Sequence, residues 1–286
     1  MHVLQQPQDD GEPARDATAA PSRMGRAIVI TSGKGGVGKT TTAANLGTAL
    51  ARRGAGVVLV DADVGLRNLD IVLGLESRVK YHVLDVLEER VSLDEALVPD
   101  KNSPTLRLLA AAQSREKDEV DTEKMRALVQ SLRERFDYVI VDCPAGIEMG
   151  FRNAVAGADE AIVICTPEVS AVRDVDRVVG LLGNRFRPQL VINRMRPQLV
   201  KKGKMLSVDD VNAILRLPLL GVIADEPAVI VATNRGEPLA LRDDSPTAAA
   251  YRAIAARIAG EDVPAPTVGN KASFFEKLGA MLGGRR

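Results

Sequence analysis

The sequence predicts an α/β protein in which a mostly parallel, twisted sheet carries helices on both faces. Seven apolar runs of strand length are continuous rather than alternating, which is typical of strands covered on both faces. Segments with helical periodicity lie between several of these runs, and the order strand, helix, strand indicates right-handed βαβ units. Polar residues follow several of the runs directly, as they do at a ligand-binding sheet edge.

The expected elements can be placed in order along the chain. The apolar runs expected to form strands are 27–30, 57–60, 106–109, 138–141, 161–164, 190–192 and 219–222. Helical patterns between them include 41–52, 122–135 and 172–182.

The chain of 286 residues divides by composition into four parts. Residues 1–25 are rich in Gln, Asp, Ala and Pro without apolar periodicity, so we expect a disordered extension. Residues 26–260 carry the strand and helix patterns of the α/β domain. Residues 261–270 resemble a linker, and residues 271–286 form a separate basic and apolar segment.

Charge and cysteine content exclude several classes of protein. Thirty-eight basic residues balance 38 acidic residues, so no global field attracts the chain to nucleic acid. The two cysteines have neither metal-site spacing nor the number that a disulfide framework needs, which favours a cytoplasmic protein. No apolar run approaches ~18 residues and no secretory signal is evident, so we expect no membrane-spanning helix.

Polar side chains follow several predicted strands where each strand ends. Asp61 and Asp63 follow the second apolar run, Asp142 follows the fourth and Asn193 follows the sixth. The carboxyl ends of parallel strands meet at one edge of the sheet, outside which ligands bind. The sequence therefore predicts one site built from these positions.

The first apolar run leads into a glycine-rich loop that matches the Walker A pattern and precedes a predicted helix. Its glycines let backbone N–H groups face phosphate oxygens at the positive end of the helix dipole. Lys39 is expected to neutralise the β- and γ-phosphates of ATP, and the Thr40 hydroxyl to ligate Mg²⁺. The predicted nucleotide-binding residues of the loop are Gly33, Lys34, Gly35, Gly36, Val37, Gly38, Lys39, Thr40 and Thr41.

The strand-end carboxylates suit the chemistry of phosphoryl transfer. Asp142 stands at the Walker B position, where a carboxylate is held near Mg²⁺. Asp61 and Asp63 can hold the metal shell or orient the attacking water, so Asp61 is a candidate metal ligand and Asp63 a candidate catalytic residue. A helix cap or solvated turn is the alternative for each of them.

Lys34 is a second lysine in a loop whose own phosphates need only Lys39. A charged group beside the phosphates that is free to point outward suits a neighbouring subunit's nucleotide, as an arginine finger does in GTPases. From spacing alone, a solvated lysine is an equal alternative.

The sequence from Lys34 to Thr40 resembles the deviant Walker A motif of the ParA/MinD family of P-loop ATPases. The segments 61–70, 142–148, 166–174 and 234–238 resemble the septum-site-determining members of that family, and the resemblance runs from about Gly25 to the C-terminus. It implies an ATP-sandwich homodimer in which Lys34 reaches the partner's phosphates.

The same resemblance assigns further roles. Asp63 positions the hydrolytic water, Asp142 serves the Mg²⁺ shell, Asn193 contacts adenine and Glu168 reaches toward the partner's nucleotide. Asp174 and Asp176 fall on the helix that lines a groove for partner proteins, with a solvated helix face as the alternative. The implied partners are a MinC-like division inhibitor and a MinE-like or equivalent regulator, and intrinsic turnover should be slow.

The C-terminal segment is expected to be an amphipathic membrane-targeting helix. Its apolar residues recur with helical spacing and basic residues outnumber the single acid, which suits an anionic lipid surface. The family resemblance implies that this surface is the cytoplasmic face of the inner membrane. The predicted membrane residues are Phe274, Phe275, Leu278, Met281, Leu282, Lys271 and Lys277. Packing of this helix onto the protein's own core is the alternative.

Other functions of the same family remain as alternatives. A ParA-like DNA-partition ATPase needs a basic surface, for which Lys201, Lys202 and Lys204 form only a small cluster, so the leading hypothesis includes no nucleic acid. A flagellar-number ATPase would share the tail, but the N-terminal extension does not resemble its activation segment. An iron–sulfur carrier is disfavoured because no Cys-x-x-Cys pair is present.

Overall fold

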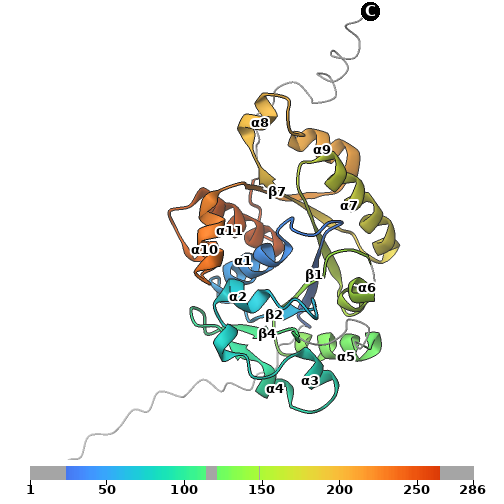
Figure 1. Cartoon of the computed structure of the whole chain (residues 1–286), viewed down its shortest axis with the longest axis vertical. Coiled ribbons are helices and arrows are strands. Elements are labelled where there is room, and N and C mark those ends of the chain that lie inside the picture. The colour runs from blue at the N-terminus through green and yellow to red at the C-terminus, as the bar shows by residue number, and fades with distance from the viewer. Residues whose placement is uncertain (1–23, 114–120, 148, 265–286) are drawn as a thin grey trace, which may run out of the picture.

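Eight strands form one sheet in the computed structural model, which describes residues 24–113, 121–147 and 149–264 (Figure 1). Their spatial order is β3-β4-β2-β5-β1-β6-β7-β8, and every neighbouring pair is parallel except β3 and β4. The strands are β1 Arg26–Thr31, β2 Val57–Asp61, β3 Val98–Pro99, β4 Leu106–Leu109, β5 Tyr138–Asp142, β6 Glu160–Cys165, β7 Gln189–Met195 and β8 Leu219–Ala224. The predicted fold class and all seven predicted strands are therefore confirmed.

Helices connect the strands and lie on both faces of the sheet, as the sequence predicted. The longer ones are α1 Lys39–Ala51, α5 Thr122–Arg133, α6 Met149–Ala156, α7 Val169–Leu182, α9 Val208–Leu215, α10 Pro227–Asn234 and α11 Pro246–Ile258. The shorter turns are α2 Leu69–Leu73, η1 Glu76–Arg78, α3 Val83–Leu87, α4 Leu93–Ala96, η3 Gly183–Arg185, α8 Pro197–Lys201 and η4 Leu239–Leu241. The expected helices 41–52, 122–135 and 172–182 correspond to α1, α5 and α7.

Local capping explains where several helices begin. The Asp121 side chain accepts hydrogen bonds from the backbone N–H groups of Glu123 and Lys124 at the start of α5. Ser245 caps α11 in the same way, and Pro246 occupies the first turn, where its missing N–H has no consequence.

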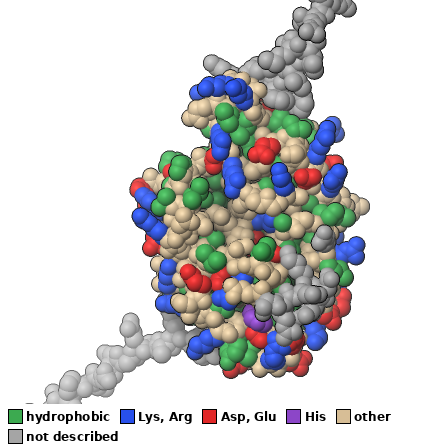
Figure 2. Space-filling model, viewed as in Figure 1, with side chains coloured by type: hydrophobic (Ala, Val, Ile, Leu, Met, Phe, Trp, Pro, Cys, Tyr) green, Lys and Arg blue, Asp and Glu red, His purple; other side chains and the backbone are tan. Residues whose placement is uncertain are grey.

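Side chains of each strand alternate between two cores. In β1, Ala27 and Val29 face a core shared with α5, α6, α7 and α9, whereas Ile28 and Ile30 face a core shared with α1, α2 and α11. Figure 1 shows α1, α10 and α11 on one side of the sheet and α6, α7 and α9 on the other. The two covered faces explain why the apolar runs are continuous. On the face of the molecule seen in Figure 2, basic and acidic side chains are interspersed.

Parts of the sequence-based expectations fall outside the described residues. These are the N-terminal extension up to residue 23, the linker from residue 265 onward, the predicted membrane helix at 271–286 and Glu148. Among the described residues, the helices are too short and too polar for any of them to cross a membrane.

Candidate functional site

The glycine-rich loop joins β1 to α1 at the carboxyl edge of the sheet. Gly36 and Gly38 have φ angles of 75° and 97°, a region that favours glycine. Gly38 also lies so close to Asn193 that an added Cβ would be 2.4 Å from Asn193 Nδ2. These conformations turn the loop sharply into the first turn of α1, whose N-terminus attracts anions.

Lys39 lies beneath this loop and is 7% exposed. Its Nζ donates a hydrogen bond to Ser32 Oγ at 3.0 Å, and Ser32 Oγ donates to the carbonyl oxygen of Lys34 at 2.8 Å. A buried ammonium group with a neutral hydroxyl partner is costly unless an anion lies nearby. The loop therefore carries a preformed positive charge that fits a phosphate chain.

Lys34 differs from Lys39 in its surroundings, although five positions separate the two in sequence. Its residue is exposed, and its side chain makes no hydrogen bond or ion pair with any residue in the described ranges. The structure therefore leaves the Lys34 ammonium group available to a second molecule, and its role in a partner's site remains a prediction.

Asp61 and Asp142 are opposite each other at the ends of the neighbouring strands β2 and β5, and both are 1% exposed. Burial, reinforced by the negative charge of Asp61, raises the pKa of Asp142 to about 8. Burial also raises the pKa of Asp61 to about 6, although backbone hydrogen bonds oppose the shift. Two buried carboxylates at one edge favour binding of a cation.

Asp142 also meets the requirements of a magnesium-shell residue. The Thr40 hydroxyl donates a hydrogen bond to its carboxylate, and Asp142 Oδ1 has no hydrogen-bond partner among the described residues. Hard oxygen donors of this kind are what Mg²⁺ prefers. The Thr40 and Asp142 oxygens thus fit the ion that the sequence predicted.

Asp61 has a different set of contacts. Its Oδ1 accepts a hydrogen bond from the N–H of Asp63 at 2.9 Å, and its Oδ2 accepts from the N–H groups of Asn68 and Leu69 at 3.2 and 3.1 Å. Asp61 therefore fixes the turn that carries Asp63 and starts α2. These contacts resemble those of a helix cap, the alternative role that the sequence left open for Asp61. Its predicted role as a metal ligand stays a prediction.

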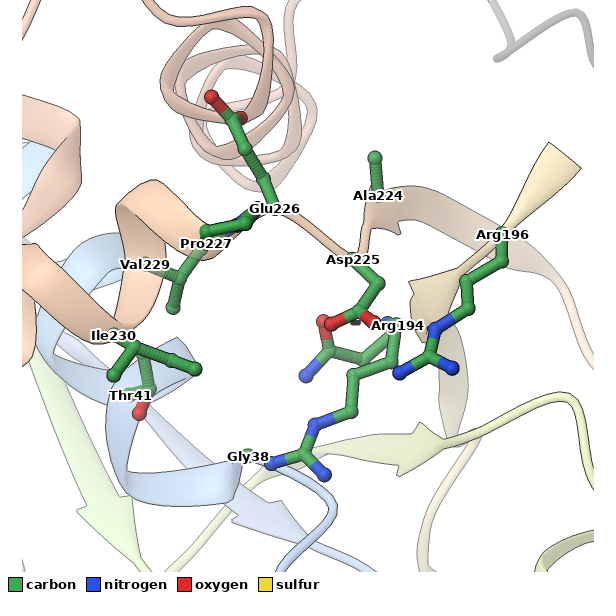
Figure 3. Close-up of a pocket in the computed structure, with 11 residues that line it drawn as sticks. Gly38, Thr41, Arg194, Arg196, Ala224, Asp225, Glu226, Pro227, Val229 and Ile230 are labelled. Atoms are coloured by element: carbon green, nitrogen blue, oxygen red, sulfur yellow. Dashed lines mark hydrogen bonds and ion pairs between the residues drawn. The ribbon is translucent and has the colours of Figure 1, made fainter. Parts of the chain in front are cut away.

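Asn193 lies directly beside the loop at the end of β7. Its Nδ2 donates to the carbonyl oxygen of Val37 at 2.8 Å. A pocket of about 280 Å³ opens next to it (Figure 3). Its lining consists of Gly38, Thr41, Asn193, Arg194, Arg196, Ala224, Asp225, Glu226, Pro227, Val229 and Ile230. A pocket that is partly apolar and adjoins a phosphate loop fits a nucleotide base and ribose.

Sequence reasoning missed most of this pocket lining. Figure 3 shows the Arg194 guanidinium pointing toward Gly38, while Arg196 pairs with Asp225 across the pocket wall. Asp225 and Glu226 could have been found in the same way as Asp61 and Asp142, because they are polar residues that follow a predicted strand, here the last one. Their distance in sequence from the loop concealed the connection.

Three further predicted site residues lie at the start of α7 or within it. Glu168 precedes its first turn and is exposed, Asp174 is half-buried with Arg177 at 3.7 Å, and Asp176 is exposed. Gly33 packs on the backbone of this helix, because an added Cβ would lie 2.2 Å from the carbonyl carbon of Asp174. Helix α7, on which the partner groove was predicted, and the phosphate loop are therefore in direct contact.

A parallel strand, a glycine loop with a buried lysine, and strand-end carboxylates define a P-loop nucleotide-binding protein. The family model described as AAA domain matches residues 25–192. The septum site-determining protein MinD of Synechocystis sp. is 54% identical over 244 residues, which cover 84% of this chain and 92% of that protein. The chain belongs to the family of the septum site-determining protein MinD.

Two solved structures of the same family share this fold. The MinC:MinD cell division complex of Aquifex aeolicus matches with a TM-score of 0.80 and 47% identity, covering 85% of this chain and all of that one. MinD of Pyrococcus horikoshii complexed with Mg-ADP matches with a TM-score of 0.75 and 30% identity, covering 82% of this chain and 96% of that one.

Proposed function

We propose that this chain is a Mg²⁺-dependent ATPase that helps to position the cell-division septum through an ATP-controlled cycle of dimerisation and membrane attachment. The observation that carries the proposal is the pair of lysines in one loop, with Lys39 buried under its own loop and Lys34 exposed. The family of the chain, and the Mg-ADP held by its Pyrococcus relative, support the choice of nucleotide and metal.

The chain's own residues account for nucleotide binding. Backbone N–H groups of the loop and the Lys39 ammonium hold the phosphates, and Asn193 with the adjoining pocket holds the base. Thr40 and Asp142 hold Mg²⁺, which supplies charge neutralisation at the phosphates. Ionised Asp142 is favoured once a cation occupies this edge.

Hydrolysis depends on Asp63, which we assign to orienting the attacking water. Asp61 acts on this step by fixing the turn through its hydrogen bond from the Asp63 N–H. The Asp61 carboxylate is held by backbone N–H groups and Asp142 is assigned to Mg²⁺, so neither is assigned to general-base catalysis, and we expect positioning to carry the reaction and turnover to be slow.

Dimerisation places Lys34 against the phosphates of the partner subunit. Four large apolar side chains in the segments that follow strands at this edge are roughly half exposed: Leu66, Ile147, Met149 and Val169. Ile147 and Met149 follow β5 and Val169 follows β6, the two strands that flank β1, whereas Leu66 follows β2, which is next to β5. Exposed apolar groups beside a site mark an interaction surface, and Glu168 lies on the same edge toward the partner's nucleotide.

Protein partners are assigned to α7. Asp174 and Asp176 lie there, and the contact of Gly33 with the helix backbone connects that surface to the phosphate loop. The complex of MinC with MinD from Aquifex supports a MinC-like inhibitor as the partner. A MinE-like or equivalent factor is proposed as the regulator of hydrolysis.

Membrane attachment is assigned to residues 271–286. Burial of five apolar side chains gains on the order of 5–10 kcal/mol, and ordering a helix of about 12 residues costs ~1 kcal/mol or more per residue. Basic residues add up to ~1 kcal/mol each, so one tail binds weakly. Two tails on a dimer gain ~10²–10⁴-fold from effective concentration, which connects ATP binding to membrane binding.

Co-sedimentation with anionic lipid vesicles tests the cycle. The full chain and a chain ending at Asn270 are compared in ATP and in ADP. We expect binding only for the full chain in ATP. Equal binding in both nucleotides, or equal binding of the shortened chain, would refute the membrane cycle, and salt-dependent DNA retention would then test a partition function.

A further inference from the structure

A second hollow lies at the opposite edge of the sheet from the nucleotide site. This amino-edge groove has a volume of about 520 Å³ and is formed where β1, β6, β7 and β8 begin and α11 ends. The charged side chains that line it are Arg26, Arg185, Arg187, Arg257, Asp159 and Glu160. None of them belongs to the site described above.

Both acids of the amino-edge groove are already paired. The Glu160 carboxylate accepts hydrogen bonds from Nε and Nη2 of Arg26 at 2.6 and 2.7 Å, and Asp159 forms an ion pair with Arg133 at 3.0 Å. These ion pairs cancel the negative charge of the groove. Within residues 24–113, 121–147 and 149–264, no acidic side chain pairs with the remaining arginines in this way.

Three arginines therefore leave an uncompensated positive charge. Arg185 donates from Nη2 to the carbonyl oxygens of Ala156 and Ala158 at 2.8 and 3.0 Å, which anchors it without neutralising it. Arg257 likewise donates to the carbonyl oxygens of Leu220, Val263 and Pro264 and pairs with no acid in the described ranges. Arg187 is exposed and makes no hydrogen bond or ion pair with any residue in the described parts of the chain.

The chain leaves the domain at this groove. Arg257 Nε donates to the carbonyl oxygen of Val263 at 3.2 Å, and Arg257 also holds the carbonyl oxygen of Pro264, where the described residues end. Residues 265–270 can span at most about 20 Å before the proposed membrane segment begins. A membrane-bound tail therefore keeps the groove close to the lipid surface.

We propose that the amino-edge groove binds the phosphate-bearing headgroup of an anionic lipid when the tail is attached to the membrane. The proposal rests on the membrane attachment proposed above. Arg185, Arg187 and Arg257 supply the charge, and the position of the groove at the chain exit favours a lipid over a free phosphate. The domain itself thereby contributes to membrane affinity beyond the tail.

Charge removal at Arg187 tests this assignment, because its exposed side chain holds no structural partner. We compare Arg187→Gln with the control Arg78→Gln, an exposed arginine in η1 that lines no part of the groove. In ATP and with vesicles containing phosphatidylglycerol, Arg187→Gln should weaken binding by roughly fivefold per subunit, and the control by less than about twofold. ATPase activity without lipid should be unchanged in both.

An equal loss in both variants, or none in Arg187→Gln, would overturn the proposal. So would a titration in which inorganic phosphate alone binds the unsubstituted protein more tightly than Arg187→Gln while the two bind vesicles equally, since the groove would then take free phosphate. The chain ending at Asn270 keeps the two proposals apart. If that chain loses vesicle binding while Arg187→Gln retains it, the groove assignment fails and the tail assignment stands.

A proximity measurement gives an independent readout. Cys143 and Cys165 are buried and free, so a fluorophore on Arg187→Cys can be placed selectively. Spin-labelled lipid should quench it in ATP and leave it bright in ADP, whereas the same label on Arg78→Cys should be quenched far less. A label at 187 that stays bright on vesicle-bound protein would overturn the proposal.

Discussion

Asp142 determines how the stability of the nucleotide-free protein responds to pH. Its pKa is near 3.8 in an unfolded chain and about 8 in the folded one, chiefly because of burial. The folded state therefore binds more protons between these values, so stability is present at low pH and is lost as pH rises toward 8. Asp61, whose pKa is raised to about 6, is almost fully ionised about one pH unit higher, which leaves Asp142 to dominate as pH rises toward 8.

We expect the melting temperature of the nucleotide-free protein to fall by several degrees from about pH 6 to about pH 8. Arg and Lys side chains do not titrate between about pH 6 and about pH 8. Asp142→Asn should flatten the profile, and excess Mg²⁺ with ATP should reduce the fall in the unsubstituted protein. Calorimetry at each pH gives the melting temperature. A melting temperature of the unsubstituted protein that stays constant or rises with pH would count against a buried, protonated Asp142.

Individual site residues were predictable to the extent that strand ends reveal them. Asp61, Asp63, Asp142 and Asn193 do meet at one edge of the sheet, because parallel strands place their carboxyl ends together. The sequence could not show that both carboxylate oxygens of Asp61 accept hydrogen bonds from backbone N–H groups, since helix capping and metal binding require the same residue type. Their catalytic and binding roles remain predictions.

The contact between the phosphate loop and α7 connects two elements. Gly33 has no room for a Cβ, because the backbone of α7 at Asp174 would lie 2.2 Å away. Gly33→Ala must therefore displace the loop or the helix. We expect it to cost about 1–3 kcal/mol of stability and to weaken ATP binding at least tenfold, measured by denaturant unfolding and calorimetric titration.

Gly180→Ala on the same helix is the matched control. Nothing lies within 4 Å of its added Cβ, so it should stabilise α7 by about 0.5–1 kcal/mol and leave ATP binding unchanged. If both variants behaved alike, the effect of Gly33 would come from backbone entropy rather than from the contact.

At the level of elements, length decided which predictions succeeded. The strands were recognisable because each buries a continuous apolar run on two faces. Strand β3 was not predicted because it has only two residues, Val98 and Pro99. Short helices such as α2 and α8 were not predicted because they have too few turns for a periodic pattern. The base pocket escaped because it combines the ends of β7 and β8 with a loop more than a hundred residues earlier in the chain.

For the whole molecule, the two lysines of the loop should separate binding from assembly. Lys34→Ala should retain ATP binding by the monomer but lose the ATP-dependent dimer, because the Lys34 ammonium group makes no contact within its own described chain. Analytical ultracentrifugation in ATP measures this. Lys80→Ala removes another exposed lysine and should leave the dimer intact, whereas a dimer that survives Lys34→Ala would contradict the trans role.

The sheet also ends in a way that limits how copies of the chain can join. The antiparallel strand β3 closes one side of the sheet with two residues, and Pro99 has no N–H to offer a neighbouring strand. A short, proline-bearing border is a poor template for strand addition. Polymerisation by strand addition is thereby disfavoured at the β3 edge. A protein that we expect to concentrate on a membrane can therefore be crowded there without forming filaments through this edge.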